Sequence, residues 1–163
     1  MSSAIVFQPI GIIHTPFSNT DDCPIQPRFA RDVAGQIEML SEFVDGLTDL
    51  GGFSHLVLLF QFHLSEDFSL RVKPYLDDTP RGVFATRAPR RPNALGMSIV
   101  RLERVAGPVV HIRDVDMVDG TPLLDIKPYV PELNPDGEIA TGWLGKKMAG
   151  GKRKTDRSPD QSV

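Results

Sequence analysis

Short apolar runs separated by glycine and proline dominate this chain and leave little room for long helices. The sequence holds 14 glycines and 14 prolines, and these residues break helices more strongly than any others. Apolar runs of strand length fall, in chain order, at residues 7–13, 35–40, 54–63, 83–86, 97–105, 109–112 and 123–126. Strands at this spacing, with almost no helix between them, predict a mainly β fold that forms a barrel or a sandwich.

Two segments depart from the plain strand pattern. Residues 41–50 suit a short helix, because Ser41 is a good N-cap and Gly51 with Gly52 would end the helix. The apolar residues of this helix would share one face: Phe43, Val44, Leu47 and Leu50. In the run 97–105 the apolar alternation changes phase at Ile99 and Val100, which predicts a β-bulge.

The chain has the length of one domain, 163 residues. We predict a barrel domain over residues 5–145 and a basic, disordered tail over residues 146–163, because the tail has almost nothing to bury. From Lys146 to Arg157 six basic residues stand against one acid, and from Arg81 to Arg104 six arginines stand against one acid. These two basic zones would serve an anionic partner such as RNA, or are solvated surface charge.

Several classes of protein are excluded or disfavoured. No apolar run approaches the roughly 20 residues of a membrane span, and the first residues lack the pattern of a secretory signal, so we expect a cytoplasmic protein. Cys23 is the only cysteine, which excludes internal disulfides and thiolate zinc sites. Neither a Walker sequence nor a Gly-x-Gly-x-x-Gly loop is present, which disfavours a doubly wound nucleotide-binding fold.

The segment 85–96 is too rich in proline and arginine for a routine strand. Pro89 and Pro92 remove backbone donors and stiffen the segment, from which three arginines project: Arg87, Arg90 and Arg91. Arginine on a rigid loop suits bidentate capture of a carboxylate or a phosphate, and the alternative is a surface turn with solvated arginines. Gly96, at the end of the segment, permits close backbone approach or a positive φ angle.

A second unusual segment, 114–129, begins with three acids at nearly alternate positions: Asp114, Asp116 and Asp119. Oxygen ligands of this kind suit hard cations, but the spacing matches no calcium loop and no histidine adjoins it, so we expect no metal. The stretch 119–122 is more simply a turn. Asp125 lies inside an apolar strand, where it faces solvent or a paired cation, Arg87 or Lys127.

These two segments together resemble the TrmO family of methyltransferases, also called TsaA-like or YaeB-like. The resemblance rests on the long motifs Val83–Arg87, Arg91–Ser98, Asp119–Pro122 and Asp125–Tyr129. Supporting matches are Pro9–Gly11, His14–Phe17, the Pro24–Pro27 loop and Phe53–Leu56. In all, the resemblance covers roughly residues 5–132 in order and without large gaps.

The resemblance implies one small β-barrel with one short helix and a flexible C-terminal tail, instead of the Rossmann-like methyltransferase fold. It implies a homodimer that binds S-adenosylmethionine near the subunit interface and methylates N6 of threonylcarbamoyladenosine in tRNA. Longer members carry a C-terminal domain that helps to engage tRNA, and this chain is expected to be a short form without it. Two alternatives stay open: a methyltransferase for a small molecule, and a non-enzymatic module that binds S-adenosylmethionine or RNA.

The family pattern also implies site residues. Cofactor contacts would fall on Pro24, Ile25, Gln26, His63, Leu64, Arg87, Leu95, Asp119, Gly120, Thr121, Pro122, Leu123 and Leu124. We expect Arg87 to hold the methionyl carboxylate, and Asp119 or Asp125 to serve the ribose or the sulfonium. Asp119 or Tyr129 would be the catalytic proton acceptor. The RNA substrate would contact Arg90, Arg91, Asn93 and Lys127.

Overall fold

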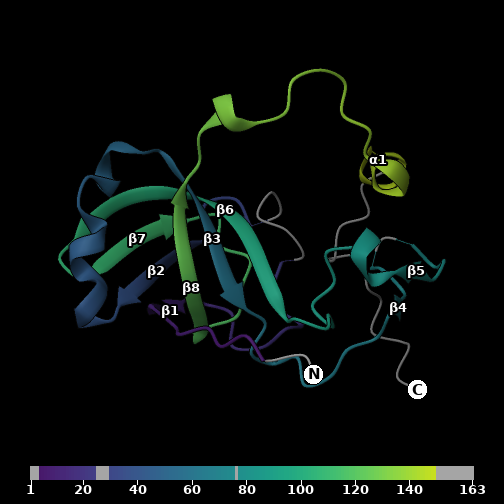
Figure 1. Cartoon of the computed structure of the whole chain (residues 1–163), viewed down its shortest axis with the longest axis horizontal. Coiled ribbons are helices and arrows are strands. Elements are labelled where there is room, and N and C mark those ends of the chain that lie inside the picture. Colours follow the sequence, from purple (N-terminus) through teal and green to yellow (C-terminus); the bar gives the residue numbers. More distant parts are fainter. Residues whose placement is uncertain (1–3, 25–29, 76, 150–163) are drawn as a thin grey trace.

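The computed structural model describes residues 4–24, 30–75 and 77–149. Six antiparallel strands close into a barrel in the order β1-β2-β7-β6-β3-β8 (Figure 1). They are β1 (Gly11–His14), β2 (Ala34–Met39), β3 (His55–Gln61), β6 (Leu95–Ala106), β7 (Val109–Arg113) and β8 (Thr121–Pro128). A separate two-stranded sheet pairs β4 (Arg71–Val72) with β5 (Arg81–Gly82). The prediction of one small β-barrel is confirmed.

The barrel is filled by side chains from alternate positions of its strands. In β3, for example, Leu56, Leu58 and Phe60 are buried, whereas the residues between them face outward. The side chains with no exposed surface are Ile13, Ile37, Leu56, Leu58, Val100, Val110, Ile112, Val115 and Leu123. Because a barrel of this size has a packed interior, a ligand must bind at one end or on the outer surface.

One end of the barrel is covered by two 3₁₀ helices, η2 (Ser41–Leu47) and η3 (Leu50–Gly52). This segment was predicted as a helix, and its expected apolar face does pack on the core, with Leu47 and Leu50 buried. The helix type and the cap were not predicted: Val44, Leu47 and Leu50 repeat every three residues, which is the 3₁₀ period. Leu40 takes the N-cap position and makes no side-chain cap bond.

Three strand predictions need correction. The run 83–86 is the 3₁₀ helix η4 (Val83–Ala85), and residues 7–10 precede β1 instead of belonging to it. The bulge in β6 lies between Leu102 and Arg104, in the pairing with β7. No phase change occurs at Ile99 and Val100, because Ile99 faces outward and Val100 faces the core in unbroken alternation. Both faces of this strand carry apolar residues, which made its alternation look irregular.

The C-terminal part of the described chain contains η5 (Pro131–Leu133) and α1 (Gly142–Ala149), neither of which was predicted. Trp143 anchors α1 to η4, since its Nε1 donates to the Ala85 carbonyl at 2.8 Å and the Arg81 guanidinium lies 5.2 Å from its ring. Helix α1 crosses the predicted domain boundary at residue 145, and residues 150–163 lie outside the described residues. None of the described helices has the length and apolar character that crossing a membrane requires.

Candidate functional site

The end of the barrel opposite η2 and η3 brings together the segments that connect its strands. Because neighbouring strands are antiparallel, the ends of β1, β3 and β7 meet the starts of β2, β6 and β8. The segments 15–33, 62–94 and 114–120 leave from this end, which faces the lower right of the barrel in Figure 1, away from η2 and η3 on the left. We call it the loop end. All the predicted cofactor residues within the described ranges lie at or next to it, and Ile25 and Gln26 lie outside those ranges.

The turn before β8 joins two of these segments. Gly120 has a φ of +78°, which L side chains rarely adopt, and its N–H donates to the Ile13 carbonyl at 3.0 Å. Asp119 Oδ1 accepts the Thr15 N–H at 3.0 Å and lies 3.2 Å from His14 Nδ1. The Asp119 side chain is nevertheless 48% exposed, so this carboxylate is tied to β1 and still accessible from outside.

Behind this turn the side chains differ in their access to a ligand. Thr121 is buried, and its hydroxyl donates to the Val118 carbonyl at 2.6 Å and lies 3.4 Å from His63 Nδ1. Leu123 fills the barrel core, so only its backbone is left for a ligand. Leu64 is exposed at the rim of the loop end.

The three arginines of the segment 62–94 have different surroundings. Arg91 Nη1 donates to three backbone carbonyls, those of Val83, Thr86 and Ala88, and therefore holds the loop in shape. Arg90 is paired with Asp67 at 2.6 Å on the surface. Arg87 is exposed and donates to the Met97 carbonyl, its one hydrogen-bond partner within the described residues. Of the three, Arg87 is the one that, within the described residues, neither pairs with an acid nor binds several loop carbonyls, so most of its donors are available to a ligand.

Asp116 also lies at the loop end, in the segment 114–120, but was not among the predicted site residues. Its Oδ1 accepts a hydrogen bond of 2.6 Å from the Ser98 hydroxyl, which points inward from β6. Burial raises the pKa of Asp116 to about 6, and the Ser98 hydrogen bond and the Arg87 charge oppose this shift. The sequence showed Asp116 only as part of an acidic run, because its burial depends on a strand 18 residues earlier in the chain.

Two of the predicted site residues lie away from the loop end. Strand β8 rises by about 3.3 Å per residue and therefore carries Tyr129 roughly 25 Å from the loop end. The Tyr129 hydroxyl instead accepts from Asn134 Nδ2 at 3.0 Å. Lys127 lies on the outer face of β8 and pairs with Asp125 at 2.7 Å, which makes Lys127, and not Arg87, the partner of this carboxylate. Asn93 is exposed beside Leu95 at the loop end.

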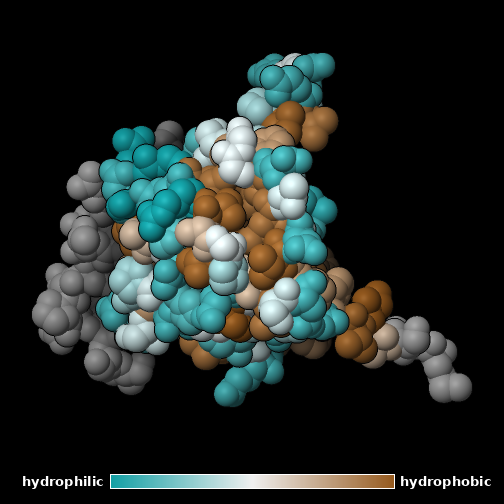
Figure 2. All heavy atoms as spheres, turned by 90° about the vertical axis from the view of Figure 1, so that its left-hand side faces the viewer, coloured by the Kyte–Doolittle hydropathy of each residue, from teal (hydrophilic) through white to brown (hydrophobic). Residues whose placement is uncertain are grey.

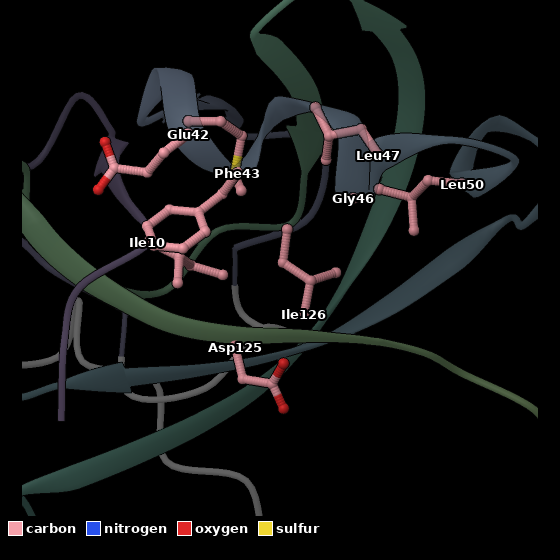
Figure 3. A pocket seen from close by; sticks show the side chains of 9 residues that line it. Ile10, Glu42, Phe43, Gly46, Leu47, Leu50, Asp125 and Ile126 are labelled. Atoms are coloured by element: carbon pink, nitrogen blue, oxygen red, sulfur yellow. The ribbon is translucent and has the colours of Figure 1, made fainter.

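A cavity of about 360 Å³ lies at the opposite end, beneath η2 (Figure 3). Figure 2 faces this side of the molecule and shows hydrophobic residues gathered at its centre. In Figure 3 the Asp125 carboxylate points away from the apolar side chains of the cavity. The lining is mostly apolar with two acids: Ile10, Met39, Glu42, Phe43, Gly46, Leu47, Leu50, Asp125 and Ile126. This lining has no cation that would hold a carboxylate or a phosphate.

A second hollow, of about 340 Å³, lies on the outer surface beside His14 and Thr15. It is lined from β2 and β7 by Gln36 and His111. Within the described ranges, no group of three or more His, Cys, Asp or Glu side chains is arranged to hold a metal ion.

Comparison with protein families gives a match over most of the barrel. The profile of the family described as tRNA-methyltransferase O N-terminal domain matches residues 12–135. Solved structures include TrmO from Pseudomonas aeruginosa, with a TM-score of 0.72 and 39% identity over 86% of this chain and 62% of that chain.

Two curated relatives show how much of other proteins the chain spans. One, from Pyrococcus abyssi, is named a probable S-adenosyl-L-methionine-binding protein and is 50% identical over 88% of this chain and 78% of its own length. Another, the tRNA (adenine(37)-N6)-methyltransferase of Homo sapiens, is 35% identical over 80% of this chain but only 31% of its own length. The chain therefore spans most of the first relative, under two thirds of the solved TrmO, and about a third of the human enzyme.

Proposed function

Because the chain belongs to the tRNA-methyltransferase O N-terminal domain family, we propose that it is a methyltransferase that uses S-adenosylmethionine to methylate N6 of threonylcarbamoyladenosine in tRNA. One observation carries this proposal. The cofactor residues that the family pattern implies come from distant parts of the sequence, and those in the described ranges converge on the loop end. Convergence of unrelated segments on one polar rim above a packed apolar core is typical of a binding site.

The residues of the loop end suit this cofactor chemically. S-adenosylmethionine carries a carboxylate, an ammonium, a sulfonium, a ribose and an adenine, and when bound it supplies an activated methyl group. Arg87 offers guanidinium donors for the carboxylate. Asp119 is an accessible carboxylate, suited to the ribose hydroxyls or to accepting the proton that the amine loses. Residues 120–123 follow Asp119 directly and offer backbone groups at the start of β8.

The same end of the barrel suits RNA as the methyl acceptor. Arg87 and Arg90 are exposed there. The sequence holds six more basic residues from Lys146 to Arg157, and those after residue 149 lie outside the described residues. Basic side chains around a surface site bind phosphates without regard to sequence and would position a nucleotide of a folded RNA over the loop end. With tRNA as the substrate, we place the protein in the cytoplasm.

Methyl transfer to defined acceptors tests this function. The protein is incubated with S-adenosylmethionine labelled on its methyl group and with tRNA that carries threonylcarbamoyladenosine next to the anticodon. The proposal expects label in the modified nucleoside, and much less label when the same tRNA carries plain adenosine at that position. Label that appears only in small molecules of a cell extract, or no transfer to any acceptor, would contradict the proposed substrate.

We also propose that the protein is a homodimer, joined through the outer face of β3 and β6. Leu95, Met97 and Ile99 point outward from β6 and are 43%, 48% and 37% exposed. On β3, Leu59 and Val57 lie opposite Met97 and Ile99 and continue this apolar strip. An apolar strip of this kind on a barrel wall supports an interface between copies. It starts at Leu95, so a cofactor at the loop end would lie beside it.

Met97→Glu tests this interface. We expect the unmodified protein to sediment as a dimer and Met97→Glu as a monomer, because the new carboxylate would have to be desolvated between two copies. The barrel should stay folded, since Met97 faces outward. Gln36→Glu, on β2 across the barrel, is the matched control and should remain dimeric. A dimeric Met97→Glu protein, or a wild type that is monomeric at every concentration tested, would contradict the proposed interface.

A further inference from the structure

The carboxyl group of Asp116 occupies an unfavourable environment that the fold itself does not explain. It is half-buried, and Ser98 donates to its Oδ1 at 2.6 Å. Within residues 4–24, 30–75 and 77–149, no other side chain donates a hydrogen bond to this carboxyl, and its second oxygen, Oδ2, is open to solvent. Removing a carboxylate from water without pairing it to a cation costs free energy, and the raised pKa of Asp116, about 6, reflects this cost.

Hydrogen bonds hold the backbone around Asp116 in place. Four hydrogen bonds made by main-chain atoms of the segment 114–120 tie it to the segment 15–33. They run from Asp114 N to Val33 O (2.9 Å), from Cys23 Sγ to Asp116 O (3.0 Å), from Thr15 Oγ1 to Met117 O (2.8 Å) and from Asp119 N to Phe17 O (2.8 Å). The carboxyl is therefore preorganised at the base of the loop end.

Asp116 and Arg87 meet at the same point of β6. Arg87 donates to the carbonyl of Met97, and Asp116 accepts from the hydroxyl of the next residue, Ser98. The two groups are close enough for the Arg87 charge to act on the pKa of Asp116. A guanidinium with donors to spare beside a carboxyl with a vacant acceptor complements a group that carries a carboxylate and an ammonium on one carbon.

We propose that Arg87 and Asp116 together form the subsite for the amino-acid end of the cofactor. Arg87 binds the α-carboxylate, and Asp116 Oδ2 accepts a hydrogen bond from the α-ammonium. This inference rests on the proposed function, and it adds Asp116 to the binding residues that the family pattern implies. It also gives an ion-pair partner to a half-buried carboxyl that makes no ion pair within the described residues.

Calorimetric titration with two neutral thioethers tests the subsite. S-adenosylhomocysteine carries the amino-acid group, and 5′-methylthioadenosine has the same adenosine and sulfur without it. Asp116→Asn keeps an oxygen for Ser98 but cannot pair with an ammonium as a charge. We expect this variant to lower the affinity for S-adenosylhomocysteine by at least about tenfold and to change the affinity for 5′-methylthioadenosine by less than about twofold.

Two more variants separate binding from structure. Ser98→Ala removes the hydrogen bond that orients the carboxyl. It should lower the affinity for S-adenosylhomocysteine by about fivefold and leave the affinity for 5′-methylthioadenosine unchanged. Asp114→Asn removes a carboxylate of the same segment that pairs with Arg101 on the outer wall, and it should leave both affinities unchanged. Unaltered S-adenosylhomocysteine binding by Asp116→Asn, or equal losses for both ligands, would overturn this inference alone. A wild type that binds neither ligand would overturn the proposed function as well.

The pH dependence gives an independent readout. An ammonium beside Asp116 favours the ionised carboxyl, so binding should lower its pKa from about 6, and affinity should fall as the pH drops through 6. The other charged or titratable groups packed on Asp116 in the described chain are the Arg87 guanidinium and the Cys23 thiol. Both remain in Asp116→Asn, so the ratio of the S-adenosylhomocysteine affinities of the wild type and of Asp116→Asn isolates the contribution of Asp116. A ratio that does not vary between pH 5 and 7.5 would contradict the ammonium contact.

Discussion

Replacing Gly96 by alanine is expected to lower the free energy of unfolding by about 3 kcal/mol, at the upper end of what overpacking a core costs. Gly96 faces the barrel interior near the start of β6, where the ring of Phe60 packs directly on it. A Cβ at this position would lie 2.2, 2.5 and 2.8 Å from three carbons of that ring. Phe60 is buried and packs edge to face on Phe62, so its ring has little room to move. Urea unfolding followed by circular dichroism measures the loss.

Gly82→Ala is the matched control for this substitution. Gly82 has a φ of −60°, and nothing lies within 4 Å of the position of an added Cβ. Alanine there should leave stability unchanged or raise it by about 0.5 kcal/mol, because it restricts the unfolded chain. If Gly96→Ala were as stable as Gly82→Ala, the close packing of Phe60 on β6 would be refuted.

Arg87→Ala is expected to weaken S-adenosylhomocysteine binding about 100-fold, which corresponds to losing a charge-assisted, two-point contact with a carboxylate. The side chain is exposed and makes a single backbone hydrogen bond within the described structure, to Met97. Its removal should therefore cost less than about 1 kcal/mol of stability. Titration calorimetry gives the affinity, and thermal unfolding without ligand confirms that the fold is kept.

Arg104→Ala is the matched control for Arg87→Ala, because it also removes one positive charge from the protein. Arg104 also belongs to β6, but its guanidinium lies 3.1 Å from His111 on the outer wall of the barrel. We expect this variant to bind S-adenosylhomocysteine like the wild type. An Arg87→Ala protein that binds as tightly as Arg104→Ala would remove the proposed carboxylate contact and, with it, half of the amino-acid subsite.

The strands of the barrel were predictable because the spacing of their apolar residues can be read within each short stretch of sequence. The runs 35–40, 54–63, 109–112 and 123–126 all contain or overlap strands of the structure. The 3₁₀ form of η2 was not predicted, because Phe43, Val44 and Leu47 also share one face of an α-helix. The sequence left two explanations for the glycine at position 96, close approach of a neighbour or a positive φ angle. The structure supports the first, because the Phe60 ring packs on Gly96 and its φ is not positive.

The residues of the candidate site were likewise predicted only in part. Arg87 and Asp119 stood out because proline, glycine and charge are concentrated around them, and the structure places both at the loop end. Asp116 was missed because its burial arises from contact with Ser98, which nothing in its own segment reveals. Tyr129 was grouped with Asp119 as a proton acceptor because both lie near one motif. Strand β8 runs between them and carries them to opposite ends of the barrel. The motif alone does not show that these residues form one strand.

A crystal structure of the protein with S-adenosylhomocysteine tests the central claim most directly, because it locates the ligand. We predict that the ligand lies at the loop end, with its amino-acid group on Arg87 and Asp116 and its adenosine along residues 119–123. The competing location is the cavity of about 360 Å³ beneath η2, at the other end of the barrel. A ligand bound in that cavity, with Arg87 and Asp116 untouched, would contradict the assignment of the loop end as the cofactor site.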